Sequence, residues 1–245
     1  MNKTFRSLLG AAVCVAAATP VVAQAQTWAS WSLPAVCPVN NVIVSLGSNT
    51  AMLTTDGGGL FSGVLASNGA GCGGMAGFST TAPNPPYNFW SPSAPYGANG
   101  PNNPGLAQFI GPVRTTITFS TAVINPLLAF TSLGNLTQPS AVTLTFSDAF
   151  QLLSDNTTAP GYWGTGTNSI VGNTLTGNEF AGVLRFNGAF TSLTFETSDV
   201  ENWTGFTVGY ESDVPEPSTV GLVLTGLFAL GVTARRRQRQ GLSQS

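Results

Sequence analysis

The sequence of 245 residues contains no histidine, and its single lysine is Lys3, near the amino terminus. Without histidine the chain can form neither a Ser-His-Asp triad nor a Cys-His pair, and it cannot supply an H-E-x-x-H zinc site. Without a lysine beyond residue 3, a Schiff base and a Ser-Lys pair are also excluded. A pair of carboxylates, as in glycoside hydrolysis, is the catalytic arrangement that remains.

Charge is scarce as well, since charged residues make up only 7% of the chain. Between residues 26 and 213 nine acidic residues face two basic ones, Arg114 and Arg185, so the net charge of this segment is −7. Nucleic-acid phosphates require basic patches, and nucleic acid is therefore excluded as a partner. The same charge disfavours binding of an acidic polysaccharide. Low charge with many Thr, Ser, Asn and Gly residues is typical of an extracellular β protein, not of a disordered chain.

Residues 1–25 have the features of a secretory signal peptide. Two basic residues precede an apolar run from residue 8 to residue 18, and Ala23-Gln24-Ala25 follows as an A-x-A cleavage site. Cleavage there would make Gln26 the first residue of the mature protein. An uncleaved anchor helix is the alternative, although the apolar run is short for a membrane span.

The three cysteines fit an exported protein. Cys14 would leave with the signal peptide, and Cys37 and Cys72 remain as a pair. In an oxidising compartment we expect a Cys37–Cys72 disulfide, which would stabilise the fold by roughly 3–4 kcal/mol in the chain-entropy model. Two cysteines without histidine do not make a metal site.

Apolar and polar residues alternate in several short segments of the body, which predicts half-buried antiparallel strands. Further short apolar runs add strand candidates, and turn signals such as Gly172-Asn173 and Asn187-Gly188 separate them. The predicted strands lie near 42–44, 60–65, 113–119, 127–130, 142–146, 170–175, 180–186, 193–196 and 206–210. The pattern predicts an all-β fold, an antiparallel β-sandwich of jelly-roll-like kind spanning residues 26–213.

Residues 67–111 interrupt this pattern, because they are rich in Gly, Pro and Asn. Proline removes donors from a β-ladder, so we expect a long irregular surface loop here. The aromatic residues Tyr87, Phe89 and Trp90 favour packing of this loop over disorder.

Residues 214–245 form a three-part segment. Pro215, Glu216 and Pro217 precede an uncharged apolar stretch from Val220 to Ala234, and an arginine cluster follows at once. The arginines could not be buried unpaired, which argues against a core helix. The stretch predicts a single transmembrane helix with Arg235, Arg236 and Arg237 as its cytoplasmic stop. At about 1.5 Å per residue it is short for the bilayer core, a gap that arginine snorkelling and local thinning could cover.

This order of Pro-Glu-Pro, hydrophobic span from Val220 to Val232 and arginine cluster resembles the PEP-CTERM sorting signal of Gram-negative bacteria. The resemblance covers about thirty residues and implies no fold for the rest of the chain. It implies recognition by an exosortase, a membrane enzyme thought to cut near the motif, in an organism that makes an extracellular polysaccharide matrix. The segment from residue 186 to residue 209 also loosely resembles closing strands of other secreted PEP-CTERM proteins, a likeness that carries no known activity.

Aromatic residues close to Asn, Gly or Pro could stack on sugar rings. Trp90, Trp163 and Trp203 are the candidate glycan contacts, with Tyr87, Tyr96 and Tyr162 beside them in the sequence. The alternative, which is the more usual role of such large side chains, is that these residues fill the core of the sandwich and the bases of its loops.

Acidic residues offer two further sites. Glu179, Glu196, Asp199 and Glu201 are the clustered candidates for a catalytic carboxylate pair. Asp155-Asn156 and the segment 199–202 offer oxygen ligands for calcium, although no EF-hand loop is present. Acidic residues also keep strand edges and turns soluble, and Asp and Asn form Asx turns, so both sets have a structural explanation. We therefore predict no catalytic residue and no resident cofactor, with calcium as an open alternative.

Together these features predict a secreted or surface-sorted, non-catalytic protein. It would pass through the inner membrane, remain anchored as a precursor and then reach the cell surface or the medium. The expected partners are the exosortase and the membrane, with extracellular polysaccharide as a further candidate. The expected role is structural or adhesive, and a carbohydrate-binding module is the first alternative. A glycan-cleaving enzyme is the second and requires two carboxyl groups ~5–9.5 Å apart in a cleft.

Overall fold

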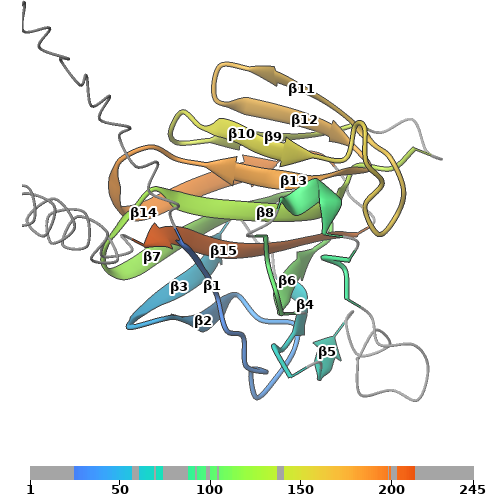
Figure 1. The fold of residues 1–245 in the computed structure, drawn as a ribbon. Coiled ribbons are helices and arrows are strands. Elements are labelled where there is room, and N and C mark those ends of the chain that lie inside the picture. The colour runs from blue at the N-terminus through green and yellow to red at the C-terminus, as the bar shows by residue number, and fades with distance from the viewer. Residues whose placement is uncertain are drawn as a thin grey trace, which may run out of the picture. The chain divides into compact units, whose positions relative to one another are not determined.

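A computed structural model gives the fold of the body (Figure 1). The structure describes residues 25–56, 61–68, 70–73, 88–91, 93–97, 100–103, 105–136, 141–197, 199 and 203–212. Every named element in this part of the chain is a β-strand except for one short 3-10 helix, η2 (Ala94–Tyr96). The described part of the chain is therefore all-β, as the sequence predicts for residues 26–213.

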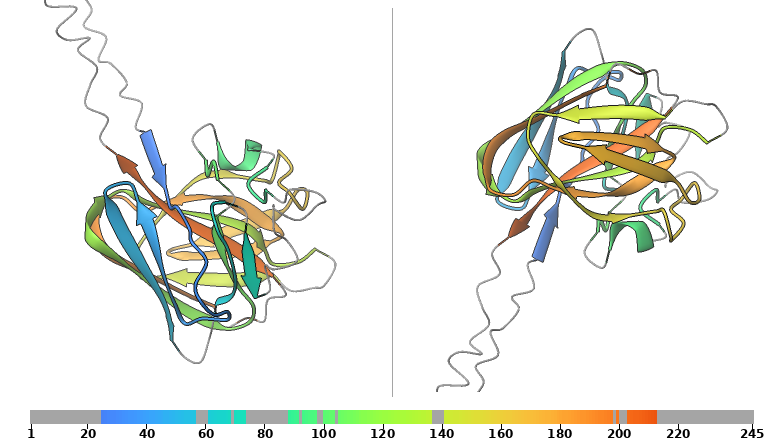
Figure 2. Two further views of the ribbon diagram at one scale, coloured as in Figure 1. Left: turned by 90° about the horizontal axis from the view of Figure 1, so that it is seen from below. Right: turned by 90° about the horizontal axis from the view of Figure 1, so that it is seen from above.

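The strands form two antiparallel sheets packed as a sandwich (Figure 2). In sheet A the order is β10 (Gln151–Asp155), β13 (Phe180–Arg185), β8 (Pro126–Leu133), β15 (Thr204–Ser212), β6 (Leu106–Phe109), β4 (Phe61–Leu65) and β5 (Gly71–Gly73), with β1 (Ala25–Trp28) paired to β15. In sheet B the order is β11 (Thr167–Val171), β12 (Thr174–Asn178), β9 (Val142–Phe146), β14 (Ala189–Thr197), β7 (Val113–Ile124), β3 (Asn49–Asp56) and β2 (Asn41–Leu46).

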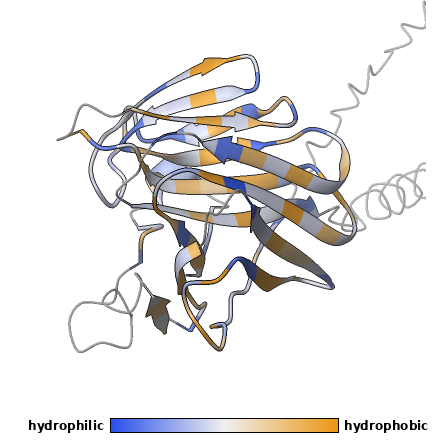
Figure 3. Cartoon of the chain, turned by 180° about the vertical axis from the view of Figure 1, so that it is seen from behind, coloured by the Kyte–Doolittle hydropathy of each residue, from blue (hydrophilic) through white to orange (hydrophobic). Residues whose placement is uncertain are grey.

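The main core lies between the sheets and is dominated by phenylalanine. Phe130 of β8 packs against Phe206 of β15, with ring centroids 6.0 Å apart, and against Phe195 of β14 on the opposite sheet at 5.7 Å. All three rings are fully buried. Hydrophobic and hydrophilic residues alternate along many strands (Figure 3), so each sheet turns its apolar side chains toward this layer.

The outer face of sheet A is also buried, which the sequence does not predict. Trp28, Phe89, Trp90 and Tyr96 pack there with outward-facing residues of β8 and β13 in a second hydrophobic cluster. Glycines make room for this layer: a Cβ at Gly209 would lie 2.7 Å from the Trp28 ring. Strand β15 is therefore buried on both faces and is not the half-buried strand that its alternation predicts.

The outer face of sheet B carries mainly hydroxyl groups and no covering layer among the described residues. The hydroxyls of Thr116 and Thr194 lie 3.2 Å apart, and those of Thr143 and Thr176 lie 3.1 Å apart. Strands β7, β9 and β14 alternate between buried and more exposed residues, as their sequences predict. Threonine suits this pleated, half-solvated surface because β-branched side chains pack well on it.

The two ends of the body lie side by side. Strand β1 pairs antiparallel with the end of β15, so that Ala25 is opposite Ser212 and Gln26 is opposite Glu211 (Figure 2). The Cys37–Cys72 disulfide is present, as predicted, and joins β5 to the segment before β2. A bond over this separation of 35 residues limits the unfolded chain.

The expected loop at 67–111 is wrong in part. Leu106–Phe109 forms β6, which lies between β15 and β4, and Gly71–Gly73 forms β5. The packing expected for Phe89 and Trp90 is confirmed, since both are buried, while Tyr87 lies outside the described residues. The single strand predicted at 170–175 is wrong, because β11 and β12 form a hairpin there, and the predicted turn signal Gly172-Asn173 lies at its turn.

None of the helices in the described part of the chain has the length and hydrophobicity to cross a membrane. The predicted transmembrane helix, the sorting motif at Pro215, Glu216 and Pro217, and the stop at Arg235, Arg236 and Arg237 lie outside the described residues, as does the predicted signal peptide up to residue 24.

Candidate functional site

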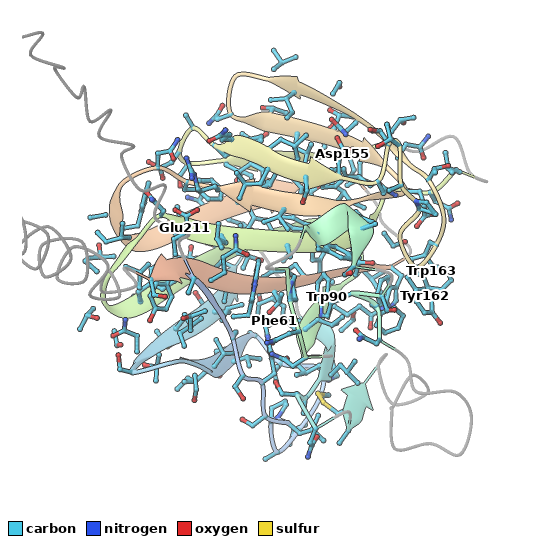
Figure 4. All side chains as sticks on the ribbon, in the orientation of Figure 1. Phe61, Trp90, Asp155, Tyr162, Trp163 and Glu211 are labelled. Carbon is cyan, nitrogen blue, oxygen red and sulfur yellow. A yellow bond between two sulfur atoms is a disulfide. The ribbon has the colours of Figure 1, made fainter. Side chains whose placement is uncertain are left out.

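A cluster of four aromatic side chains lies at one end of the layer that covers sheet A. Phe89 is its buried centre and lies close to Tyr162 at 4.9 Å, Trp203 at 4.8 Å and Trp163 at 6.3 Å between ring centroids. Trp163 is the exposed member, with 46% of its surface accessible to solvent. Figure 4 shows Tyr162 and Trp163 together at the rim of the body.

A tight hairpin presents the two outer rings. Gly161 and Gly164 form two backbone hydrogen bonds, in which each N–H donates to the carbonyl of the other glycine, at 2.8 and 3.1 Å. Tyr162 and Trp163 occupy the two turn positions between these glycines. Gly164 has a φ of +106°, which L side chains rarely adopt and glycine tolerates. The sequence Gly-Tyr-Trp-Gly carries this turn signal, which the sequence analysis missed.

Asn156 holds the hairpin against sheet A. Its side-chain NH2 group donates to the carbonyls of Gly164 at 3.1 Å and Glu179 at 2.8 Å, and its side-chain oxygen accepts from the Ala181 N–H at 2.9 Å. The residue is 1% exposed, so all three bonds are shielded from water. A buried amide with such partners fixes a loop because breaking any bond leaves a polar group unpaired.

The ring contacts set the orientation of Trp163. Its ring lies nearly parallel to that of Phe89, at an interplanar angle of 19°, while Tyr162 meets it edge-on at 4.9 Å and 75°. The Trp203 ring also meets it edge-on, with ring centroids 6.0 Å apart and an interplanar angle of 62°. Stacked and edge-on ring contacts of this kind are favourable, so three neighbouring rings restrict the orientation of the Trp163 indole before any ligand arrives.

The three tryptophans predicted as candidate glycan contacts separate in the structure. Trp90 is 2% exposed and packs edge-on against Tyr96 in the covered layer, so it has the core role that the alternative assigns to it. Trp203 is a partly buried member of the aromatic cluster, and Trp163 is exposed.

Tyr96 is buried in the same layer. Its hydroxyl donates a hydrogen bond to the Phe89 carbonyl at 3.1 Å, and burial raises the pKa of its phenol well above the usual range.

A polar depression of about 380 Å³ on the outer face of sheet B is a separate candidate site. Arg114 spans it between Asp56 at 3.8 Å and Glu196 at 4.0 Å, and these three residues are opposite one another on β3, β7 and β14. All three side chains are more than half exposed, so the attractions are weak. Threonines from β9 and β14 supply the other polar groups.

The carboxylates that were candidates for a catalytic pair have structural partners. Glu196 faces Arg114, Glu179 accepts from the Ser132 hydroxyl at 2.6 Å, and Asp199 accepts from the Thr143 N–H at 2.8 Å. Glu201 lies outside the described residues. The bonds of Glu179 and Asp199 are typical of turns and strand ends.

The candidate calcium ligands are used in the same way. Asp155 accepts from the N–H and hydroxyl of Thr157, at 2.9 and 2.6 Å, and from Asn168 at 3.0 Å. Partial burial by itself would raise the pKa of the Asp155 carboxyl, but these hydrogen bonds outweigh it, so the pKa is lowered. Within the described residues no three Cys, Asp or Glu side chains form a group suited to a metal ion.

Comparison with known protein families, curated proteins and solved structures finds no match for this chain. The geometry of the body and the two terminal segments of the sequence are therefore the basis for a functional proposal.

Proposed function

We propose that this chain is an exported, surface-sorted and non-catalytic protein, processed by an exosortase, that serves as a structural or adhesive component of an extracellular polysaccharide matrix. In this proposal the body is a jelly-roll-like sandwich, and residues 214–245 act as a PEP-CTERM sorting signal with a transmembrane helix and a cytoplasmic arginine stop.

The observation that carries the proposal is the three-part order of the carboxyl-terminal segment, combined with an amino-terminal export signal. The segment contains Glu216 between two prolines, then an uncharged span, and then three consecutive arginines. This is the order of parts in a PEP-CTERM sorting signal. The arginines favour retention on the cytoplasmic side, because cytoplasmic flanks of membrane spans carry an excess of Arg and Lys.

The body supports the same proposal in two ways. Its disulfide fits an oxidising compartment, since such bonds persist in secreted proteins. Its ends pair in β1 and β15, so the predicted signal-peptide site after Ala25 and the sorting segment after Ser212 connect to neighbouring positions of one sheet. Processing at both ends would then leave the rest of the sandwich undisturbed.

The proposal is tested by replacing Glu216 with Ala and following the protein by cell fractionation. We expect the variant to accumulate in the inner membrane as a precursor, while the wild-type protein is released. Asp148→Ala, a change on the surface of the body, is the control and should be released normally. Normal release of the Glu216→Ala protein would contradict exosortase processing.

A further inference from the structure

We infer that the Gly161–Gly164 hairpin is a binding platform for neutral polysaccharide, on which the Trp163 indole stacks against a sugar ring. The inference rests on the proposed function only for where the glycan is met, in an extracellular matrix. The binding itself is a property of the folded body.

The first argument is that the exposed ring is held in place before binding. Trp163 stands between two glycines that bond to each other, lies nearly parallel to buried Phe89 and is flanked by Tyr162. A flexible surface tryptophan would lose side-chain freedom on binding, whereas this one has already lost it on folding. An exposed indole on a rigid base thus binds at a reduced entropic cost.

The second argument concerns the shape of the ligand. The exposed part of the Trp163 indole offers a small, flat, apolar surface, which suits the apolar face of a pyranose ring. A protein partner usually requires about 800 Å² on each side, far more than one ring supplies. A polysaccharide fits this surface better, because one sugar ring matches one indole in size and the polymer repeats that ring along its length.

The third argument concerns charge. Both basic residues of the body already face carboxylates: Arg114 lies near Asp56 and Glu196, and Arg185 lies 3.2 Å from Glu211. With a net charge of −7 between residues 26 and 213, the body would repel uronates, sulfates and phosphates. A neutral glycan is the class of polysaccharide that this surface accepts.

The experiment uses the full-length chain, purified in a detergent without a sugar headgroup so that the detergent does not occupy the platform. Binding is measured by depletion onto cellulose, chitin and insoluble mannan, and by affinity electrophoresis in gels that contain xylan, galactomannan or the anionic polymer alginate. Tryptophan emission is recorded with the soluble polymers. We expect binding to at least one neutral polymer, a shift of emission to shorter wavelength, and no binding to alginate.

Trp163→Ala should weaken binding at least about tenfold, as expected for an aromatic residue at the centre of a contact. It should also abolish the emission shift, and Trp163→Phe should retain part of the affinity. Ile43→Ala is the matched control, because Ile43 is an exposed apolar residue on the outer face of sheet B with 63% of its surface accessible. This variant should bind like the wild type.

Unchanged binding by Trp163→Ala, or equal losses in Trp163→Ala and Ile43→Ala, would overturn the inference. Binding to alginate alone, or no binding of the folded wild-type chain to any neutral polymer, would overturn it as well. Each result is independent of sorting: a Glu216→Ala protein that is released normally contradicts exosortase processing and leaves the platform intact, and the reverse also holds.

Discussion

The outer faces of the two sheets differ although both sheets contribute to one sandwich. On sheet A, aromatic residues from distant parts of the sequence form a second buried layer, and Trp163 is exposed at its end. On sheet B, threonine hydroxyls lie on the outer face and hydrogen-bond to one another in pairs. Of the two outer faces, that of sheet A therefore carries the large aromatic side chains, where they can support a binding surface.

The two basic residues of the body also differ in their surroundings, one on sheet A and one on sheet B. Arg185 of β13 bonds to Glu211 of β15, whose side chain is 6% exposed and also accepts from Asn125 at 2.7 Å. Arg114 of β7 lies across the open depression of sheet B, and its partners are mostly exposed. Similar ion pairs therefore have different surroundings, and mutations on the two faces should have different costs.

The largest expected effect comes from removing the centre of the covered layer. Trp90→Ala leaves a large cavity beside Tyr96 and should lower the free energy of unfolding by about 3–5 kcal/mol. Urea denaturation followed by circular dichroism measures this change. Met52→Ala on the outer face of sheet B, where 43% of the side chain is exposed, is the control and should cost less than about 1 kcal/mol.

Trp90→Phe sharpens this test. The buried indole N–H of Trp90 has no hydrogen-bond partner among the described residues, so phenylalanine removes an unpaired donor together with some volume. We expect it to cost clearly less than alanine, because losing an unpaired donor offsets part of the lost packing. Equal destabilisation by Trp90→Ala and Met52→Ala would show that the layer contributes little to stability.

The two arginines give the next largest difference. Arg185→Ala leaves the buried Glu211 carboxylate with Asn125 and should cost about 2–3 kcal/mol in urea denaturation. Arg114→Ala should cost less than about 0.5 kcal/mol, and 0.5 M salt should reduce even that. Equal costs would mean that the two faces do not differ in solvent screening.

The sequence predicts three strands of sheet B from their alternation, whereas β3 and the hairpin of β11 and β12 in the same sheet are not predicted. Where one face meets water, as in β7, β9 and β14, alternation is visible in the residues. Strand β6, Leu-Ala-Gln-Phe, is buried throughout, so it shows no alternation and its sequence does not predict a strand. Composition misled there, since the surrounding glycines and prolines describe the flanking segments and not the strand.

The candidate site could be predicted only in part. Trp163 and Trp203 are identifiable from their chemistry, but their exposure depends on contacts with Phe89, which is more than 70 residues earlier in the chain. Such contacts follow from the pairing of strands, and local pattern does not reveal that order. The role of Asn156 was missed for the same reason, because Ala181 and Glu179 reach it only through β13 and the turn before it.

The smallest expected effect concerns a hydrogen bond between the edge strands β10 and β11, which belong to different sheets. Asp155, the last residue of β10 in sheet A, accepts a hydrogen bond from Asn168 of β11 in sheet B and two from Thr157. These bonds lower the pKa of its carboxyl, against the effect of partial burial. A lowered pKa in the folded state means that the ionised group stabilises the fold above about pH 4 and that this stabilisation is lost as the pH falls further.

Asp155→Asn should therefore cost a few tenths of a kcal/mol at pH 7 and progressively less as the pH falls below about 4, where the wild-type carboxylate takes up a proton. Urea denaturation at pH 7, 5, 4 and 3 measures the difference at each value. Asp148→Asn is the control, because Asp148 accepts its hydrogen bond from the adjacent Ser147 and joins no second sheet. A cost of Asp155→Asn that stayed constant with pH would show that the negative charge of the carboxylate does not stabilise this edge.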